Sequence, residues 1–175
     1  MRRTFGLILL VSFIALMGMS IDTFSAQMAA KYIGTDTCKM CHMKQYRSWA
    51  QTKMAKTFQD SLNAEQRQEP ECISCHSTGF KRPGGFENSQ STPKMAGVQC
   101  EGCHGPGSLY YTDQMMRNRY ASMQVGMLEQ NEKVCITCHN ENSPTYSGPF
   151  KFDKNKGVHE HSPMSQWFKK HQFDR

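Results

Sequence analysis

The sequence predicts a compact, mainly α-helical domain with much irregular coil, and three observations support this. Residues 43–62 contain no Gly or Pro, and apolar side chains recur among them at helical spacing. Residues 77–99 are instead broken repeatedly by Gly and Pro, which is typical of loops. The length of 175 residues fits one domain of ordinary size.

Three segments are expected to be helical. The first helix, over residues 43–62, would carry on one face Met43, Tyr46, Ala50, Met54 and Phe58. The second would run over residues 108–123, after the helix-breaking sequence Gly-Pro-Gly at 105–107. The third would begin near Ser162 and Pro163, because Ser caps a helix start and Pro fits its first turn. The rest of the chain is expected to be coil.

The first residues have the features of an export signal. Arg2 and Arg3 give a positive start, and the uncharged run at 5–19 is followed by a stretch of mostly small and polar residues. The run is shorter than the roughly 20 apolar residues of a membrane-spanning helix. We therefore expect residues 1–25 to be a signal peptide, either cleaved between about 25 and 30 or retained as an anchor. In both cases residues 31–175 form a periplasmic domain.

The net charge of +6 does not indicate nucleic-acid binding. Lys and Arg are dispersed along the chain with Asp and Glu between them, as in the tail after residue 150. This pattern is typical of a solvated surface, so no nucleic acid is expected as a partner.

The cysteines provide the strongest signal in the chain. All eight fall in Cys-x-x-Cys pairs, and a His directly follows each pair. The four motifs are Cys38, Cys41 and His42; Cys72, Cys75 and His76; Cys100, Cys103 and His104; and Cys135, Cys138 and His139. In c-type haem attachment the two thiols join the porphyrin and the following His binds the iron on its proximal side. Zinc sites and disulfides also use paired cysteines, but neither requires a His after each pair.

Four covalently attached haem c groups are therefore predicted, and they also account for the modest aromatic fraction of 10%. Haems bury large apolar surfaces and replace hydrophobic side chains in a core. The motifs are unevenly spaced and the sequences between them do not repeat, which favours one domain wrapped around the haems.

The supply of distal iron ligands is limited. Of seven His, four are proximal, which leaves His159, His161 and His171. Four bis-His haems are therefore impossible within one chain. Either some of the 13 Met bind iron or some irons keep an open face. Packing in the core is the usual role of Met, so it remains the alternative for each candidate.

The sequences beside the motifs are more particular than the motifs themselves. Ser48 and Trp49 follow the first motif, Ser-Thr-Gly-Phe at 77–80 follows the second, and Gly-Pro-Gly at 105–107 follows the third. The tail contains Phe-Lys-Phe-Asp at 150–153 and His-Glu-His at 159–161. In these features the chain resembles the tetrahaem cytochrome c-554 family, electron acceptors of hydroxylamine oxidation in ammonia-oxidising bacteria.

The resemblance implies a mainly helical fold with closely stacked haems. It also implies distal His ligands at the first, third and fourth haems and a five-coordinate second haem. The distal His that the family has in its C-terminal tail corresponds to His159, and His161 follows two residues later. Met54 stands where the family has a distal His, twelve residues after His42.

One further family ligand falls at Gln114, so that Met115 or Met116 is expected to bind iron after a small shift. His171 has no counterpart and is expected to be solvated.

We expect an electron carrier without catalytic residues. The resemblance implies a hydroxylamine-oxidoreductase-like donor and a membrane cytochrome or quinone reductase as acceptor. An alternative is reduction of a small nitrogen oxide such as nitric oxide at an open haem on His76, near Lys81 and Arg82. A third hypothesis, a polymeric haem wire, is disfavoured because few His remain to be lent between subunits.

Overall fold

The computed structural model describes residues 29–144 and 146–152. The predicted export signal, the third predicted helix, His159, His161 and His171 lie outside the described residues. Within these ranges, no helix combines the length and apolar character needed to cross a membrane.

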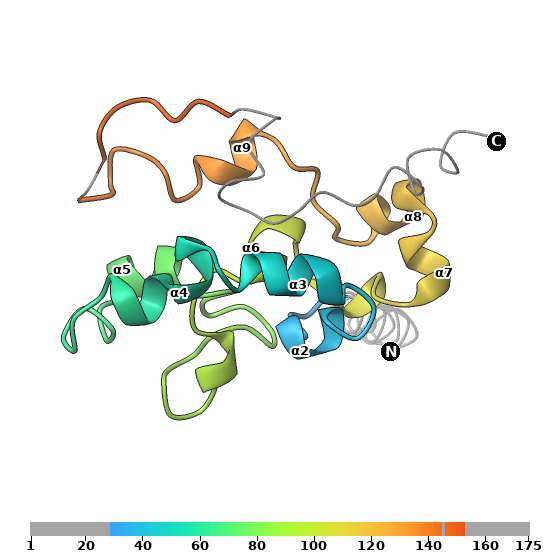
Figure 1. Ribbon diagram of the computed structural model, residues 1–175, viewed down its shortest axis with the longest axis horizontal. Helices are drawn as coiled ribbons and strands as arrows, with labels where there is room; N and C mark the ends of the chain where they lie inside the picture. Colours follow the sequence, from blue (N-terminus) through green and yellow to red (C-terminus); the bar gives the residue numbers. More distant parts are fainter. Residues whose placement is uncertain (1–28, 145, 153–175) are drawn as a thin grey trace, which may run out of the picture.

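The described chain is a series of short helices joined by coil (Figure 1). The α-helices are α2 (Thr35–Cys38), α3 (Met43–Trp49), α4 (Lys53–Asp60), α5 (Pro70–His76), α6 (Cys100–His104), α7 (Asp113–Met116), α8 (Arg119–Gln124) and α9 (Glu132–Cys135). Two 3₁₀ turns, η1 (Pro93–Met95) and η2 (Gly107–Leu109), lie between them. Strand-like pairing in these residues is limited to an isolated bridge between Ser77 and Ala96. The predicted helical, coil-rich fold is confirmed.

The prediction of one continuous helix over residues 43–62 was wrong, because the chain breaks between α3 and α4. The Thr52 side chain accepts a hydrogen bond from the Ala55 N–H (3.3 Å) and donates one to the Trp49 carbonyl (2.7 Å). Thr52 thus caps the start of α4, and its hydroxyl also satisfies a carbonyl group at the end of α3. The segment 108–123 is divided in the same way, because Thr112 caps α7 and Asn118 caps α8.

The hydrophobic core is small and lies around α4, α5 and the following loop. It contains Phe58, Leu62, Ile73, Phe86 and Met95. The rings of Phe58 and Phe86 are 5.3 Å apart, and Phe86 is fully buried. Each such side chain contributes about 1.5–3 kcal/mol when buried. A core of this size fits a chain that shares its interior with large apolar cofactors.

The glycine-rich loop after α5 is held by buried hydrogen bonds. The Thr78 hydroxyl donates to the Gly97 carbonyl and accepts from the Gln99 N–H, at 2.8 Å each. The Gln99 side chain in turn accepts from the Thr35 hydroxyl at 2.7 Å. These bonds fasten the loop to the start of α6 and join α6 to α2, with which it packs.

Candidate haem-attachment sites

Each motif forms one helical turn. Two motifs lie within α5 and α6, while the first begins at the end of α2 and the fourth at the end of α9. In these last two, the helical hydrogen bond is made from the His42 N–H to the Cys38 carbonyl (2.9 Å) and from the His139 N–H to the Cys135 carbonyl (3.0 Å). Residues three apart share a helix face, so both thiols of a motif point to the same side. This is the geometry that attachment to one porphyrin edge requires.

Thiols of different motifs lie close together. Cys38 shares a hydrogen bond with Cys100, which joins the first motif to the third. Cys138 shares a hydrogen bond with Cys75 and lies within electrostatic range of Cys103, which places the fourth motif near the second and the third. The four attachment points therefore form one connected series, in the order first, third, fourth and second.

These contacts change the acidity of the thiols before any haem is attached. Hydrogen bonding to Cys100 and burial raise the pKa of Cys38, whereas the same bond lowers the pKa of Cys100 to about 7. Burial, followed by the neighbouring Cys75, raises the pKa of Cys138 to about 12. Thioether formation removes these protons, so the shifts belong to the free thiols alone.

No disulfide bond joins any of the eight cysteines. In the part of the chain that the structure describes, no three His, Cys, Asp or Glu side chains gather as they would around a metal ion.

His76 of the second motif is oriented by α4. Its Nδ1 lies 2.8 Å from the Thr57 hydroxyl and 3.2 Å from the Thr57 carbonyl. With Nδ1 engaged in this way, Nε2 is the nitrogen left to bind iron, as the proximal role requires. The residues of this motif therefore fit a covalent haem.

Met54 lies beside the third motif. It lines a narrow cavity of about 20 Å³ together with Trp49, Val98, Gln99, Cys100, Cys103, His104 and Gln130. The Val98 N–H donates to the Met54 carbonyl at 3.1 Å, and the Trp49 indole N–H donates to the Val98 carbonyl at 2.9 Å. Met54 follows the first motif in sequence, but the structure brings it to the cavity shared with His104.

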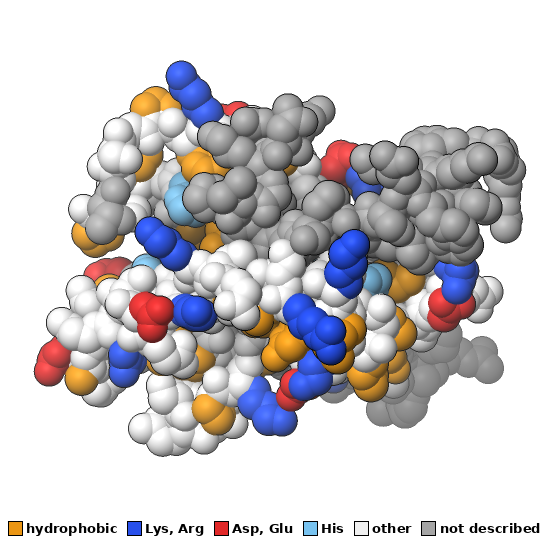
Figure 2. Space-filling model, in the orientation of Figure 1, with side chains coloured by type: hydrophobic (Ala, Val, Ile, Leu, Met, Phe, Trp, Pro, Cys, Tyr) orange, Lys and Arg blue, Asp and Glu red, His pale blue; other side chains and the backbone are white. Residues whose placement is uncertain are grey.

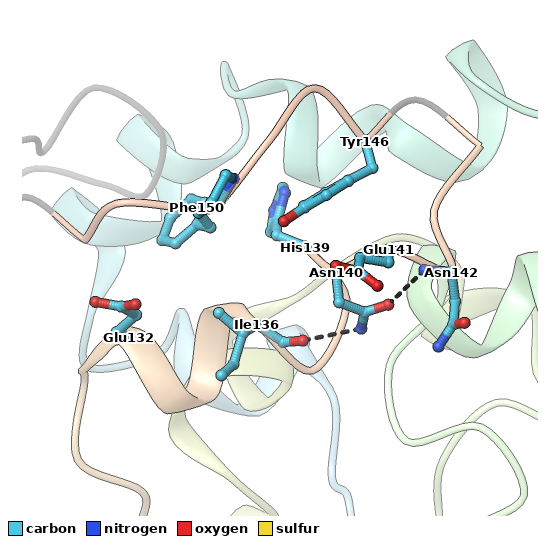
Figure 3. A pocket seen from close by; sticks show the side chains of 9 residues that line it. Glu132, Ile136, His139, Asn140, Glu141, Asn142, Tyr146 and Phe150 are labelled. Atoms are coloured by element: carbon cyan, nitrogen blue, oxygen red, sulfur yellow. Dashed lines mark hydrogen bonds between the residues drawn. The ribbon is translucent and has the colours of Figure 1, made fainter.

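His139 of the fourth motif lines a larger cavity, of about 410 Å³ (Figure 3). Figure 3 shows His139 between Phe150 and Tyr146, with Ile136 at the end of α9 nearby. The Phe150 ring stacks on the imidazole with a centroid separation of 5.0 Å. A volume in this range, aromatic walls and an adjoining Cys pair suit a porphyrin.

The remaining Met candidates lie elsewhere. Met115 and Met116 are half-buried on α7, which packs against α8. Neither side chain lines the cavity at His104 or the cavity at His139.

Glu101, between the cysteines of the third motif, is a residue that the sequence analysis missed. Its side chain is 2% exposed and accepts hydrogen bonds from three backbone N–H groups. These belong to Ile33 (3.0 Å to each oxygen), Gly34 (2.7 Å) and Gly107 (2.6 Å). Glu101 thus joins the segment before the first motif to the third motif.

The charge of Glu101 is felt by its neighbour Tyr110, whose pKa is raised by burial and then by this carboxylate. Glu is seldom buried, so an acidic residue inside a motif is ordinarily assigned to the surface. The sequence signal that could have indicated burial of Glu101 is its position between two cysteines that must face a haem.

Gly105 shows how the chain turns away after the proximal His104. Its φ of 79° lies in the left-handed region, and a Cβ would stand 2.2 Å from the Gly126 carbonyl oxygen. Only Gly fits this position, which ends α6 and lets the chain continue into η2.

Comparisons with known proteins agree with the site. Residues 37–105 match the family model of cytochrome c554 and c-prime. Cytochrome c-554 of Nitrosomonas europaea is 32% identical over 99 residues, which cover 48% of this chain and 42% of that protein. The chain thus matches less than half the length of this relative. The structure of reduced cytochrome c554 from Nitrosomonas europaea shares the fold, with a TM-score of 0.55 and 24% identity over 84% of this chain and 80% of that chain.

The fold and the repeated attachment turns are consistent with a multihaem c-type cytochrome, the class of protein in which haem c is bound covalently and transfers electrons. The comparisons support the predicted resemblance to the cytochrome c-554 family.

Proposed function

We propose that the protein is a periplasmic cytochrome that relays electrons through four haems between redox partners. The observation that carries this proposal is the connected series of thiols, Cys38 with Cys100, Cys103 with Cys138, and Cys138 with Cys75. Haems attached at adjoining points have short distances between their edges, and short distances favour electron hopping. The chain therefore provides a route through all four attachment sites.

The proximal ligands of this relay are His42, His76, His104 and His139. Met54 is proposed as a distal ligand, and its place in the cavity at His104 supports the haem of the third motif as its target. Met115 or Met116 and His159 or His161 are proposed for two of the other irons. The haem at His76 keeps an open face, as the family resemblance implies.

The proposed donor is a hydroxylamine-oxidoreductase-like enzyme, and the proposed acceptor is a membrane cytochrome or quinone reductase. A feature of the surface supports docking to an acidic partner. Between residues 39 and 59 the chain contains no Asp or Glu. The basic side chains of α3 and α4 are exposed there, and we call these four residues the basic face: Lys44, Arg47, Lys53 and Lys56.

Figure 2 shows basic side chains spread over this part of the molecule with few acidic ones between them. Such a surface steers an acidic partner towards the first and third motifs, which contain Cys38 and Cys100 and lie nearest to α3. Residues 1–25 are proposed as the signal that exports the chain, either cleaved or retained as an anchor.

The test is electron delivery to the purified holoprotein. A hydroxylamine-oxidising haem enzyme and hydroxylamine are mixed with the oxidised protein, and haem reduction is followed by absorbance. The proposal predicts reduction of all four haems without consumption of a small-molecule acceptor. Rapid reoxidation by nitric oxide, with the gas consumed stoichiometrically, would instead support a nitrogen-oxide reductase.

A further inference from the structure

The contact between α4 and α5 determines which nitrogen of His76 carries its proton. A carbonyl oxygen can only accept, so the approach of Nδ1 to the Thr57 carbonyl (3.2 Å) requires a proton on Nδ1. The Thr57 hydroxyl, 2.8 Å from the same nitrogen, donates its own proton towards the Ser61 hydroxyl at 3.5 Å. Its lone pairs are then directed at the Nδ1 proton. Both acceptors on Thr57 therefore favour the same tautomer of His76.

Thr57 is itself held firmly in place. Its neighbour Phe58 is 4% exposed and packs against Phe86, which fixes the rotation of α4 about its axis. Thr57 then faces α5 with a half-buried side chain. Its hydroxyl is consequently a preorganised acceptor and does not depend on the arrival of the haem.

We propose that Thr57 is a positioning residue for the second haem, one that sets the donor strength of His76 towards iron. The proposal rests on the proposed haem at Cys72 and Cys75. A hydrogen bond from Nδ1–H to a hydroxyl oxygen adds electron density to the imidazole, and a more basic imidazole stabilises ferric over ferrous iron. The Thr57 hydroxyl therefore lowers the reduction potential of this haem and strengthens its iron–histidine bond.

The second haem is where such tuning has most effect, because an iron with an open face depends on one axial protein ligand. An open ferrous haem also has a vibration between iron and histidine that reports this bond directly. The potential reports the same bond whether or not the other face is occupied.

The experiment compares the holoprotein with Thr57→Val, which keeps the side-chain shape but removes the hydroxyl, and with Thr57→Ser, which keeps the hydroxyl. Thr37→Val is the matched control, since the Thr37 hydroxyl donates to the Ile33 carbonyl (3.2 Å) beside the first motif. The midpoint potentials of all haems are measured by redox titration, and the iron–histidine mode by resonance Raman spectroscopy of the ferrous protein.

In Thr57→Val one potential should rise and the iron–histidine mode should move to lower frequency, while Thr57→Ser and Thr37→Val keep the wild-type values. The shift is only part of the full effect, because the backbone carbonyl of residue 57 remains in every variant. If Thr57→Val does not accumulate as holoprotein, Thr57→Ala is compared with Thr57→Ser in its place, with the same expectation.

Unchanged potentials and an unchanged Raman mode in the variant without the hydroxyl would overturn the proposal. A wild-type protein without a haem at Cys72 and Cys75 would overturn it as well. Intact mass separates these two failures, because only the second lowers the number of haems per chain.

Discussion

Replacing Glu101 by Gln tests whether the buried carboxylate fastens the first motif to the third. Gln retains the length of the side chain but replaces one acceptor oxygen by an amide that donates. That amide would then face the N–H of Gly107 or those of Ile33 and Gly34, all of which need an acceptor. The substitution therefore leaves at least one backbone donor in the interior without a partner.

The expected loss of stability follows from these bonds. Hydrogen bonds to charged acceptors contribute about 1.5–3 kcal/mol and neutral ones about 0.5–1.5 kcal/mol. Two of the donors exchange a charged acceptor for a neutral one and lose about 1–1.5 kcal/mol each, and the third loses its acceptor and about 1.5–3 kcal/mol, so the loss for Glu101→Gln is about 3.5–6 kcal/mol. In a chain of this size, 1 kcal/mol corresponds to roughly 2–4 °C, so the Tm should fall by roughly 7–24 °C.

The assay is thermal unfolding of the holoprotein, followed by circular dichroism. Glu71→Gln is the matched control, because Glu71 directly precedes the attachment cysteine Cys72 but its side chain is exposed. Its substitution should change the stability by less than about 0.5 kcal/mol. Equal Tm values for Glu101→Gln and Glu71→Gln would refute the assigned role of Glu101.

The remaining predictions concern the haems and the surface. Glu101→Gln should raise the potential of one or both haems at Cys38 and Cys100, because a buried negative charge favours ferric iron; Glu71→Gln should leave them unchanged. Met54→Ala should remove part of the weak sulfur-to-iron absorption band and lower one potential, since thioether ligation raises it; unaltered spectra and potentials would make Met54 a packing residue. Charge reversal of the basic face should slow electron delivery from an acidic partner at least severalfold and weaken its salt dependence; an unaffected rate would place docking elsewhere.

The attachment sites could be proposed from the sequence alone, because each motif is contained within five consecutive residues. The spacing of two thiols and a His depends on one helical turn, and that turn needs no distant contact. The helical, coil-rich fold was also predictable, since the long Gly- and Pro-containing loop and the apolar periodicity of residues 43–62 are local signals.

The features that depend on tertiary contacts could not be predicted. The break at Thr52 depends on a side chain competing for backbone groups in a segment with unbroken helical periodicity. The association of Cys38 with Cys100 joins positions far apart in the chain. The position of Met54 at the cavity of His104 and the three backbone N–H groups around Glu101 also depend on distant parts of the chain. No periodic pattern in the sequence encodes either contact.

The number of haems per chain shows whether all four attachment motifs carry haem. Intact-protein mass spectrometry of the purified holoprotein, under denaturing conditions that release any haem not covalently held, measures this number. If all four motifs carry haem, the mass equals that of the polypeptide plus four haems, and no thiol is left to react with an alkylating reagent. A mass with fewer haems, or cysteines that remain free to be alkylated, would contradict attachment at all four motifs.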